Sequence, residues 1–541
     1  MQAFADLLDA LIFMPSRNGK LRLMADYFAN APDPDRGWAL AALTGNLSFK
    51  NAKAGLVREL IADRTDPELF RWSYDFVGDL AETASLMWPD PDPKPNSPVP
   101  GLTEIVETLQ AAKRAEVPGI VAAWFDRGAP NERYSLIKLM TGGLRIGVSA
   151  RLAKLSLAQW SEIDVAEIEE IWHGLAPPYL NLFEWLEGKA EQPNIEEGAI
   201  FRPPMLANPL EADDIAKLSA DDYRAEWKWD GIRVQLASRR TSEGLITRLY
   251  SRTGDDISRT FPDIIESVDF EAVLDGELLV FRDGQVASFN DLQQRLNRKT
   301  VTAKMLADAP AHIRVYDILF DGREDLRPLP FDERRGRLEG WFETTTPKRM
   351  DLSTLVEFGS WDELGEIRST SRDAPDSLVE GLMLKHKASA YLQGRPKGPW
   401  FKWKRNPLLL DCVLMYAQRG HGKRSSFYSD YTFGAWRPKA DGEGRELVPV
   451  GKAYFGFTDD ELKQIDKFVR NNTTARYGPV REVAFGEDVG LVLEVAFDSV
   501  HESTRHKSGL AMRFPRIHRI RWDKPTGEAD TVESLSKLIT A

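Results

Sequence analysis

One lysine, Lys228, lies in the segment 226–233 (EWKWDGIR) between acidic and aromatic neighbours, and a glycine and strand-forming residues follow it. Lysine can form a covalent bond to phosphorus through its side-chain nitrogen once the ammonium has lost a proton. The four residues Lys-x-Asp-Gly are a weak signal by themselves, because a surface strand that runs into a turn produces the same pattern. Lys228 is therefore a candidate nucleophile that needs support from the rest of the chain.

Five further segments follow in order and supply the other groups that nucleotide chemistry requires. Residues 274–278 and 380–385 each place a glutamate next to a glycine in a strand-like run. Residues 315–319 put an aromatic ring on a strand, and residues 251–254 add an arginine in a turn. Residues 400–404 hold two lysines two positions apart, so both point to one face of a strand. The candidate side chains are Arg252, Glu277, Tyr316, Glu380, Lys385, Lys402 and Lys404.

These residue types suit attack on a polyphosphate. A nucleophilic lysine must be partly neutral, and cations such as Lys402 and Lys404 are expected to lower its pKa. Transfer at an α-phosphorus needs positive charge on the non-bridging oxygens and a divalent metal. Glu277 and Glu380 are suitable oxygen ligands for Mg²⁺. Tyr316 offers an aromatic platform for a purine base.

Several neighbouring residues have a simpler structural reading. Asp230 and Gly231 are expected to shape the turn that presents the lysine, in addition to any direct role. Asp275 is expected to fix a tight turn at a strand start rather than to bind metal. Trp227 and Trp229 are expected to pack on the opposite face of their strand.

Composition sets the broad class. A chain of 541 residues is expected to form two to four domains. Its net charge is −12, yet residues 385–405 carry seven Lys/Arg and no acid, and residues 503–524 carry seven against one acid. Such segregated basic surface is what phosphate binding needs. The single cysteine excludes a disulfide within the chain and a four-cysteine zinc site, and a reducing cytoplasm, guessed to be bacterial, is the expected location.

The elements that must position these groups change along the chain. Residues 1–200 show helical spacing of apolar residues and predict an all-α domain, with an extended proline-rich loop at 88–101. Residues 205–405 alternate short strands with a helix near 332–342 and predict an α+β domain. Residues 406–541 contain mostly short strands and predict a small β-barrel.

The ordered set of segments resembles the nucleotidyltransferase motifs of the ATP-dependent DNA ligases. Residues 139–149 (LMTGGLRIGVS) are similar to part of the helical DNA-binding domain of the larger ligases. Residues 508–516 (SGLAMRFPR) and 521–524 (RWDK) are similar to their C-terminal motif. The resemblance covers nearly the whole chain. It implies a helical DNA-binding domain, an ATP-grasp-like nucleotidyltransferase domain and an OB-fold barrel, in that order.

The resemblance implies a role for each matching residue around the nucleotide. Lys228 becomes adenylylated, and Glu226 helps to recognise adenine. Arg233 and Arg252 contact the sugar and phosphate. Glu277 contacts the ribose or the metal.

The remaining pocket residues complete this implied site. Tyr316 stacks on the base, where many relatives have phenylalanine. Glu380 holds the metal. Lys385, Lys402 and Lys404 neutralise the α-phosphate. The implied catalytic residues are Lys228, Lys402 and Lys404.

The C-terminal motif and the helical domain carry the implied contacts outside the pocket. Arg521, Asp523 and Lys524 orient the pyrophosphate leaving group during self-adenylylation, so the barrel must approach the nucleotide for the first step and move away afterwards. The implied DNA contacts are Arg145, Gly147, Arg513 and Arg516.

The expected function is an ATP-dependent DNA ligase that uses Mg²⁺, acts as a monomer and seals nicked duplex DNA through a lysyl-AMP and a DNA-adenylate. The alternatives are an RNA ligase or capping enzyme, which the helical domain disfavours, and a catalytically silent nick-binding module. An NAD-dependent ligase is disfavoured because one cysteine cannot form the zinc finger of that group. The sequence does not indicate which pathway uses the enzyme, replication, repair or end joining.

Overall fold

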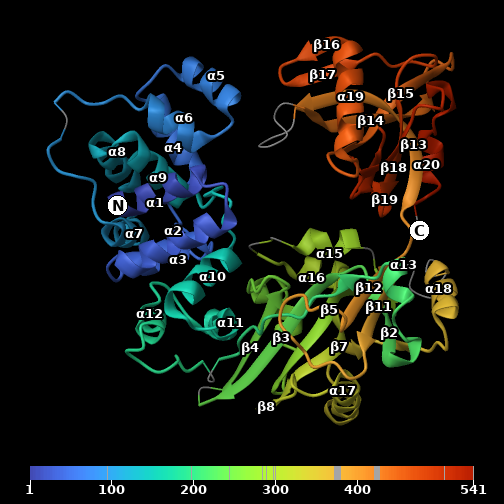
Figure 1. Ribbon diagram of the computed structural model, residues 1–541, viewed down its shortest axis with the longest axis horizontal. Helices are drawn as coiled ribbons and strands as arrows, with labels where there is room; N and C mark the ends of the chain where they lie inside the picture. The colour runs from blue at the N-terminus through green and yellow to red at the C-terminus, as the bar shows by residue number, and fades with distance from the viewer. Residues whose placement is uncertain are drawn as a thin grey trace.

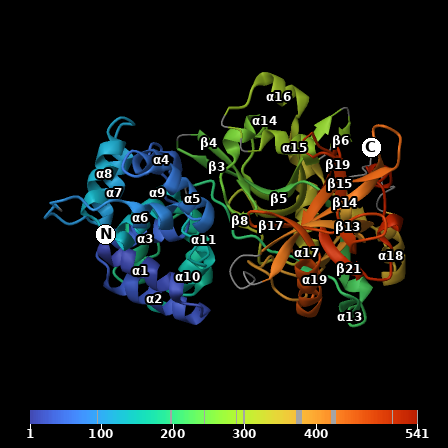
Figure 2. The same cartoon turned by 90° about the horizontal axis from the view of Figure 1, so that it is seen from above.

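A computed structural model describes residues 1–93, 95–195, 198–242, 244–282, 284–287, 289–296, 298, 300–370, 379–419, 427–504 and 506–539. Figure 1 shows three regions in chain order: a helical region in blue, a central region in green and yellow, and a strand-rich region in orange and red. Seen from above, the helical region lies to one side of the other two (Figure 2). Within the described residues, no helix is long and apolar enough to cross a membrane.

The first region is built from helices. These are α1 (Gln2–Phe13), α2 (Arg17–Asn30), α3 (Asp35–Leu43), α4 (Ala54–Ala62), α5 (Pro67–Val77), α6 (Leu80–Met87), α7 (Leu102–Ala111), α8 (Val117–Arg127), α9 (Pro130–Thr141), α10 (Ala150–Ser161), α11 (Val165–Ile171), the 3₁₀ turn η1 (Trp172–Gly174) and α12 (Leu180–Leu186).

Local signals explain where several of these helices begin and end. Asp66 caps α5 by accepting from two backbone amides, and Gly78 ends it in the left-handed conformation. The Ser149 hydroxyl likewise caps α10 by accepting from the backbone amide of Leu152. Leucines on one side of α1, among them Leu8 and Leu11, are fully buried in the shared core. Apolar spacing and caps together thus account for the predicted all-α region.

The central region holds two sheets and short helices. Its strands are β1 (Asn208–Pro209), β2 (Tyr223–Trp229), β3 (Ile232–Thr241), β4 (Gly244–Ser251), β5 (Ala272–Arg282), β6 (Gln285–Val286), β7 (Ala311–Asp321), β8 (Glu324–Asp325), β9 (Met350–Leu352), β10 (Leu355–Val356), β11 (Val379–His386) and β12 (Trp400–Lys404). Its helices are α13 (Ala212–Ile215), α14 (Pro262–Ile265), α15 (Phe289–Arg295), α16 (Ala303–Asp308), α17 (Phe331–Thr345) and α18 (Trp361–Ser369), with 3₁₀ turns at Ala220–Asp222 and Ser258–Thr260.

The two sheets differ in strand order. One runs β1-β12-β11-β2-β10, and the other runs β4-β3-β5-β7-β8 with β6 and β9 attached. Strand β2 passes directly into β3 through Asp230 and Gly231, so the chain crosses from the first sheet to the second at this point. A Cβ on Gly231 would lie 2.5 Å from the carbonyl oxygen of Leu278, which leaves no room for a larger residue. The predicted turn after the candidate lysine is confirmed.

The tight turn predicted at Asp275 is wrong. Asp275, Gly276 and Glu277 lie inside β5, where they pair with β3 on one side and β7 on the other. A Cβ on Gly276 would come within 2.7 Å of Ile313 on the neighbouring strand, so the glycine permits close strand approach rather than a turn. An aspartate–glycine pair is typical of both settings, and sequence alone does not separate them.

The last region is a strand-rich barrel with helical additions. Its elements are β13 (Leu408–Arg419), β14 (Tyr428–Pro438), β15 (Arg445–Ala453), α19 (Asp459–Asn471), β16 (Thr473–Tyr477), β17 (Val480–Val483), β18 (Val492–Phe497), β19 (Ser499–Glu502), β20 (Leu510–Arg513), β21 (Arg516–Arg521), the 3₁₀ turn Thr526–Glu528 and α20 (Val532–Ser536).

Long strands hold this region together. β13 pairs with β14, β17 and β18, and β18 pairs in turn with β21. The only cysteine of the chain, Cys412, lies on β13 with no exposed surface, and burial raises the pKa of its thiol well above the usual value. Helix α19 begins at a capping box in which Thr458 and Glu461 satisfy each other's backbone amides. The strands predicted here at 411–417, 431–436 and 491–497 are confirmed to within a few residues.

A half-buried histidine, His173, lies where the helical region meets the central one and makes this junction sensitive to acid. The His173 ring packs edge-on against Phe201 at 4.7 Å, and Gly254 presses against it. Burial, aided by Lys154, lowers the pKa of His173 to about 4. The unfolded chain therefore binds more protons between about pH 6.5 and 4, and stability falls as the pH drops through that window, by about 3 kcal/mol at most.

The expected result is a larger drop in Tm between pH 6.5 and 4.5 for the natural chain than for His173→Gln, which keeps a polar side chain without a titrating ring. Thermal unfolding at both pH values measures this difference. An equal drop in both proteins would mean that His173 does not control the acid sensitivity of the junction.

Candidate active site

The candidate nucleophile is positioned by a row of residues across three strands. Lys228 on β2 pairs with Gly381 on β11, and Gly381 pairs with Lys404 on β12. Gly381 has φ +136°, and a Cβ there would lie 2.3 Å from the carbonyl oxygen of Trp403. A glycine in the middle of the row therefore lets β12 approach β11 closely and places no side chain between the two lysines.

A second row, two residues along, lies on the same face of the sheet. Glu226 on β2 pairs with Met383 on β11, and Met383 pairs with Lys402 on β12. Because side chains alternate along a strand, Glu226 and Lys228 share a face, as do Lys402 and Lys404. The prediction that the two lysines of β12 point the same way is confirmed.

The other sheet closes the site from the opposite side. Arg233 on β3 pairs with Glu277 on β5, and Tyr316 lies on β7. A cavity of about 430 Å³ lies between the sheets, a size suited to a small-molecule ligand. Of the residues predicted for the nucleotide, it is lined by Glu226, Lys228, Arg233, Arg252, Glu277, Tyr316, Glu380, Lys385, Lys402 and Lys404.

The charge around Lys228 differs from the expectation. Its ammonium lies 2.6 Å from the Glu380 carboxylate. Burial by itself would lower the pKa of Lys228, but nearby carboxylates outweigh burial and the pKa is raised, with Glu380 acting most strongly and Glu277 next. The expectation that Lys402 and Lys404 depress this pKa is therefore wrong, because a carboxylate lies in direct contact with Lys228.

Lys402, rather than Lys228, is the cavity lysine whose pKa is lowered. Burial lowers the pKa of Lys402, and the cations Arg395 and Lys404 add to the effect. Lys402 therefore lines the cavity beside other positive side chains, an arrangement that favours an anionic ligand.

The pKa values of the two candidate metal ligands, Glu277 and Glu380, are shifted in opposite directions. Burial raises the pKa of Glu277 to about 8, although Lys228 opposes it. Burial would also raise the pKa of Glu380, but Lys228 and Lys404 hold it at about 2. No group of three or more His, Cys, Asp or Glu that could hold a metal ion occurs in the described part of the chain. Mg²⁺ often binds through one or two carboxylates plus substrate phosphates, so the pair fits a metal that enters with a nucleotide.

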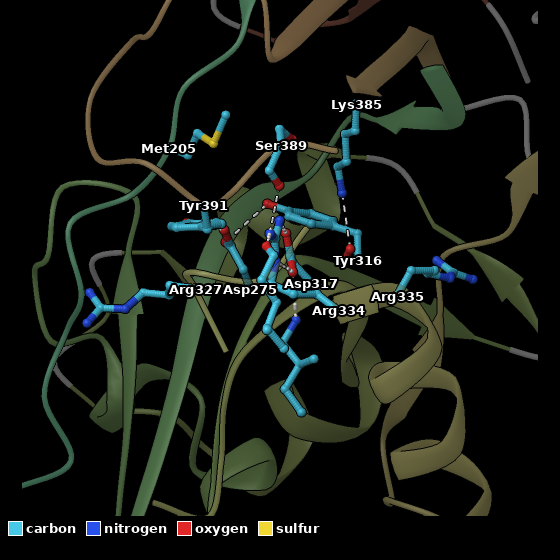
Figure 3. A network of polar contacts seen from close by, with 12 residues as sticks. Met205, Asp275, Tyr316, Asp317, Arg327, Arg334, Arg335, Lys385, Ser389 and Tyr391 are labelled. Atoms are coloured by element: carbon cyan, nitrogen blue, oxygen red, sulfur yellow. Dashed lines mark hydrogen bonds and ion pairs between the residues drawn. The ribbon is translucent and has the colours of Figure 1, made fainter. Parts of the chain in front are cut away.

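A buried ion network forms the base of the cavity. Glu226 is 2% exposed and contacts Lys385 at 2.8 Å and Arg335 of α17 at 3.2 Å. Lys385 also donates to the backbone oxygen of Tyr316 at 3.0 Å and lies 4.6 Å from the centre of its ring (Figure 3). The structure thus ties Lys385 to protein groups, and its predicted contact with an α-phosphate stays a prediction.

Arg233 is also held by protein groups. Its guanidinium forms two hydrogen bonds with Asp275, at 3.1 and 2.6 Å, and a third with the backbone oxygen of Met205. Asp275, 1% exposed, accepts from Tyr391 at 2.7 Å and from Tyr316 at 3.3 Å (Figure 3). Asp275 therefore orients Arg233 and the aromatic side chains at the edge of the cavity, a role that the sequence reading missed.

The C-terminal motif lies away from this cavity. Lys524 contacts Asp411 at 2.8 Å, and Arg521 contacts Asp411 at 3.2 Å and Asp523 at 2.9 Å. None of Arg521, Asp523 and Lys524 lines the cavity that holds Lys228. The structure does not bring these predicted pyrophosphate ligands to the nucleotide site.

Another face of the barrel contacts the site instead. Arg513 is hydrogen-bonded to Asp230, which lies in the turn after β2. Asp498 accepts from Lys404 at 3.2 Å and from Arg516 at 2.9 Å. The side chains of the predicted DNA contacts Arg513 and Arg516 are therefore engaged in ion pairs within the chain.

The two predicted DNA contacts in the helical region lie in the loop between α9 and α10. Arg145 is exposed and has φ 52°, and Gly147 has φ 66°. The Lys20 ammonium donates to the backbone oxygen of Ile146 and would collide with a Cβ on Gly147. This loop is held in a conformation that favours glycine at position 147.

Some cavity residues were missed by the sequence reading. Arg395 lines the cavity and had a detectable signal, since it lies in the basic window 385–405. Arg335 and Tyr391 do not line the cavity but hold Glu226 and Asp275, and they had no such signal, because these partners are more than a hundred residues away along the chain.

A lysine that lines a cavity between two sheets, with carboxylates and further lysines around it, is typical of a nucleotidyltransferase. Residues 204–404 match the family profile described as ATP dependent DNA ligase domain, and residues 424–524 match the one described as ATP dependent DNA ligase C terminal region. The chain belongs to the ATP-dependent DNA ligases, the enzymes that seal nicks in DNA. The resemblance drawn from the motifs is confirmed.

Individual relatives agree with this assignment. A probable DNA ligase of Koribacter versatilis is 35% identical over 76% of this chain and 72% of its own length. A probable DNA ligase of Opitutus terrae is 30% identical over 99% of this chain, but the match spans 62% of that longer protein. A solved structure titled "Pmar-Lig_Pre." has a TM-score of 0.60 at 15% identity and covers 96% of this chain and 99% of that one. This last likeness shows the fold, with helical, nucleotidyltransferase and barrel regions in the predicted order.

Proposed function

We propose that Lys228 is the residue that carries AMP. The observation that supports this is its position in the lining of the cavity, in one row with Gly381 and Lys404, while Lys402 lies in the next row. The Lys228 nitrogen attacks the α-phosphorus of ATP, a nitrogen–phosphorus bond forms, and the bond to pyrophosphate breaks. The ammonium proton must leave first, so release from Glu380 is part of this step.

Two further transfers complete the reaction. An oxygen of the 5′-phosphate at a nick attacks the AMP phosphorus, and the lysine nitrogen leaves and takes up a proton. The 3′-hydroxyl then attacks the activated 5′-phosphate, the strand is sealed, and AMP leaves. Nicked duplex DNA is the proposed substrate, a monomer the proposed active form and the bacterial cytoplasm the proposed location.

The side chains of the cavity are proposed to divide the work. Lys402 and Lys404 face the phosphate oxygens and balance their charge, and Glu226 recognises the base. When bound, Mg²⁺ supplies further positive charge to the phosphates, and Glu277 and Glu380 would hold it. Positioning and electrostatic stabilisation supply most of the rate in phosphoryl transfer of this kind.

The C-terminal barrel is proposed to change its position during the cycle. Lys524 and Arg521 are paired with Asp411 away from the cavity, whereas Arg513 and Asp498 contact the central region. For Lys524 to orient pyrophosphate, these contacts must break and the barrel must turn its other face to the nucleotide. The barrel position in this structure, with Lys524 away from the cavity, is then the one that the protein adopts before or after self-adenylylation.

Incubation with labelled nucleotide tests the proposal. The protein is mixed with Mg²⁺ and ATP or GTP labelled at the α-phosphate, or with labelled NAD. The expected result is an acid-labile label on the protein from ATP alone, which disappears when nicked DNA is added and appears in the DNA. Absence of label from ATP would contradict the proposal, and label that persists in the presence of nicked DNA would contradict its second step.

A further inference from the structure

A second cavity adjoins the nucleotide cavity where the helical and central regions meet. Its volume is about 160 Å³, and it shares Leu206 and Arg252 with the larger cavity. Helix α10 supplies Arg151 and Lys154, and the turn after β4 supplies Arg252. Three cations therefore surround this space against a single carboxylate, that of Glu169, among the described residues that line it.

The charges inside this cavity do not cancel. Glu169 lies 3.2 Å from the Lys154 ammonium and 4.0 Å from the Arg151 guanidinium. Glu169 lies closer to the mostly buried Lys154 and reaches Arg151, 57% exposed, only at the longer distance, so its single negative charge does not balance Arg151, Lys154 and Arg252 together. A partly enclosed space with a net positive lining attracts an anion.

Two glycines with positive φ lie beside this space. Gly394 has φ +79°, a conformation that favours glycine, and its backbone lies next to the Arg151 guanidinium. Gly254 has φ +86° and packs directly against the His173 ring, which fixes the turn that presents Arg252. The two basic sides of the cavity are thereby held facing each other.

The position of the cavity favours a nucleic-acid strand over the nucleotide as the source of the anion. The larger cavity is lined by residues between 206 and 404 only, so the helical region is not part of it. Arg151 and Lys154 come from the helical region and follow directly on the loop 142–149 that holds Arg145. Helix α10 also has no acidic residue in its first turn, which leaves its positive end uncompensated.

We propose that this cavity binds a backbone phosphate of the DNA strand being joined, next to the phosphate that reacts, through Arg151, Lys154 and Arg252. The proposal rests on the ligase function and extends it. A strand phosphate held at the junction of the helical and central regions would position the nick relative to the nucleotide cavity.

The test is binding of the full-length Arg151→Gln protein to a nicked duplex at several salt concentrations. The expected result is a severalfold higher Kd at 0.1 M salt, and a decrease of about 1 in the magnitude of the slope of log K against log salt, because one phosphate contact is lost. Arg71→Gln is the matched control, since Arg71 in α5 is 66% exposed and has an equally weak partner in Glu68 at 3.8 Å. Arg151→Lys, which keeps the charge, should recover much of the binding.

Two results would overturn the proposal. If Arg151→Gln and Arg71→Gln change the Kd and the salt slope equally, the cavity holds no strand phosphate. If Arg151→Gln raises the KM for ATP in self-adenylylation more than the Kd for DNA, the cavity receives the polyphosphate of the nucleotide. Labelling of the same proteins with ATP separates this from a failure of the proposed lysyl-AMP chemistry, because it is read without DNA.

Discussion

Replacement of Lys228 by alanine is expected to abolish attachment of AMP to the protein, with a loss on the order of 10⁴-fold or more in self-adenylylation, because the nitrogen proposed to attack the α-phosphorus is removed. Lys228→Arg is expected to fail equally. A guanidinium at this position keeps a positive partner for Glu380, which lies 2.6 Å from the lysine ammonium, but it does not lose its proton at accessible pH. Labelled protein after incubation with α-labelled ATP measures both losses.

Two comparisons make this result specific to the nucleophile. Lys217→Ala, at an exposed lysine of the same region, should label like the natural chain. Both Lys228 variants should still join a nick that already carries AMP, more slowly, because the transfer to the protein has been bypassed. Acid-labile label on Lys228→Ala would show that another residue carries the nucleotide.

Replacement of Lys524 by alanine is expected to separate the first step from the last. If Lys524 orients pyrophosphate as the leaving group, its loss should slow self-adenylylation by roughly 10²-fold, the cost of removing one positioned donor. Sealing of a pre-adenylylated nick involves no pyrophosphate, and its rate should fall by much less. Single-turnover measurements of both steps on the same protein give the two factors.

Lys537→Ala is a suitable control, because Lys537 lies in the same barrel, is 72% exposed and pairs only with Glu533 among the described residues. Equal losses in both steps for Lys524→Ala would mean that the residue stabilises the barrel through its contact with Asp411 rather than acting on the leaving group. Normal self-adenylylation would mean that the barrel does not bring Lys524 to the nucleotide.

The sequence predicted which residues meet at the cavity better than it predicted their electrostatics. The order of short motifs located Lys228, Glu277 and Glu380, and all three line one cavity. The pKa of Lys228 was predicted in the wrong direction. Charges two residues apart on one strand are visible in a sequence, whereas the 2.6 Å contact with Glu380 depends on the pairing of β2 with β11, about 150 residues further along the chain.

The arrangement of whole regions was also only partly predictable. Apolar periodicity and turn residues were sufficient for the helical region and for most strands, because they are local properties. The position of Lys524 depends on which face of the barrel contacts the central region. That choice is made by a few contacts, such as Arg513 with Asp230, between residues that are 283 positions apart. Contacts of this kind leave no local pattern.

The burial of Cys412 makes the proposed movement of the barrel directly observable. Its thiol has no exposed surface and its pKa is raised, so it stays protonated and out of reach of thiol-specific dyes. The natural chain is then already a background free of attachment sites. One cysteine introduced on the barrel and one on the central region would be the only labelled positions, and the separation of two probes could be followed in a single molecule through each round of strand joining.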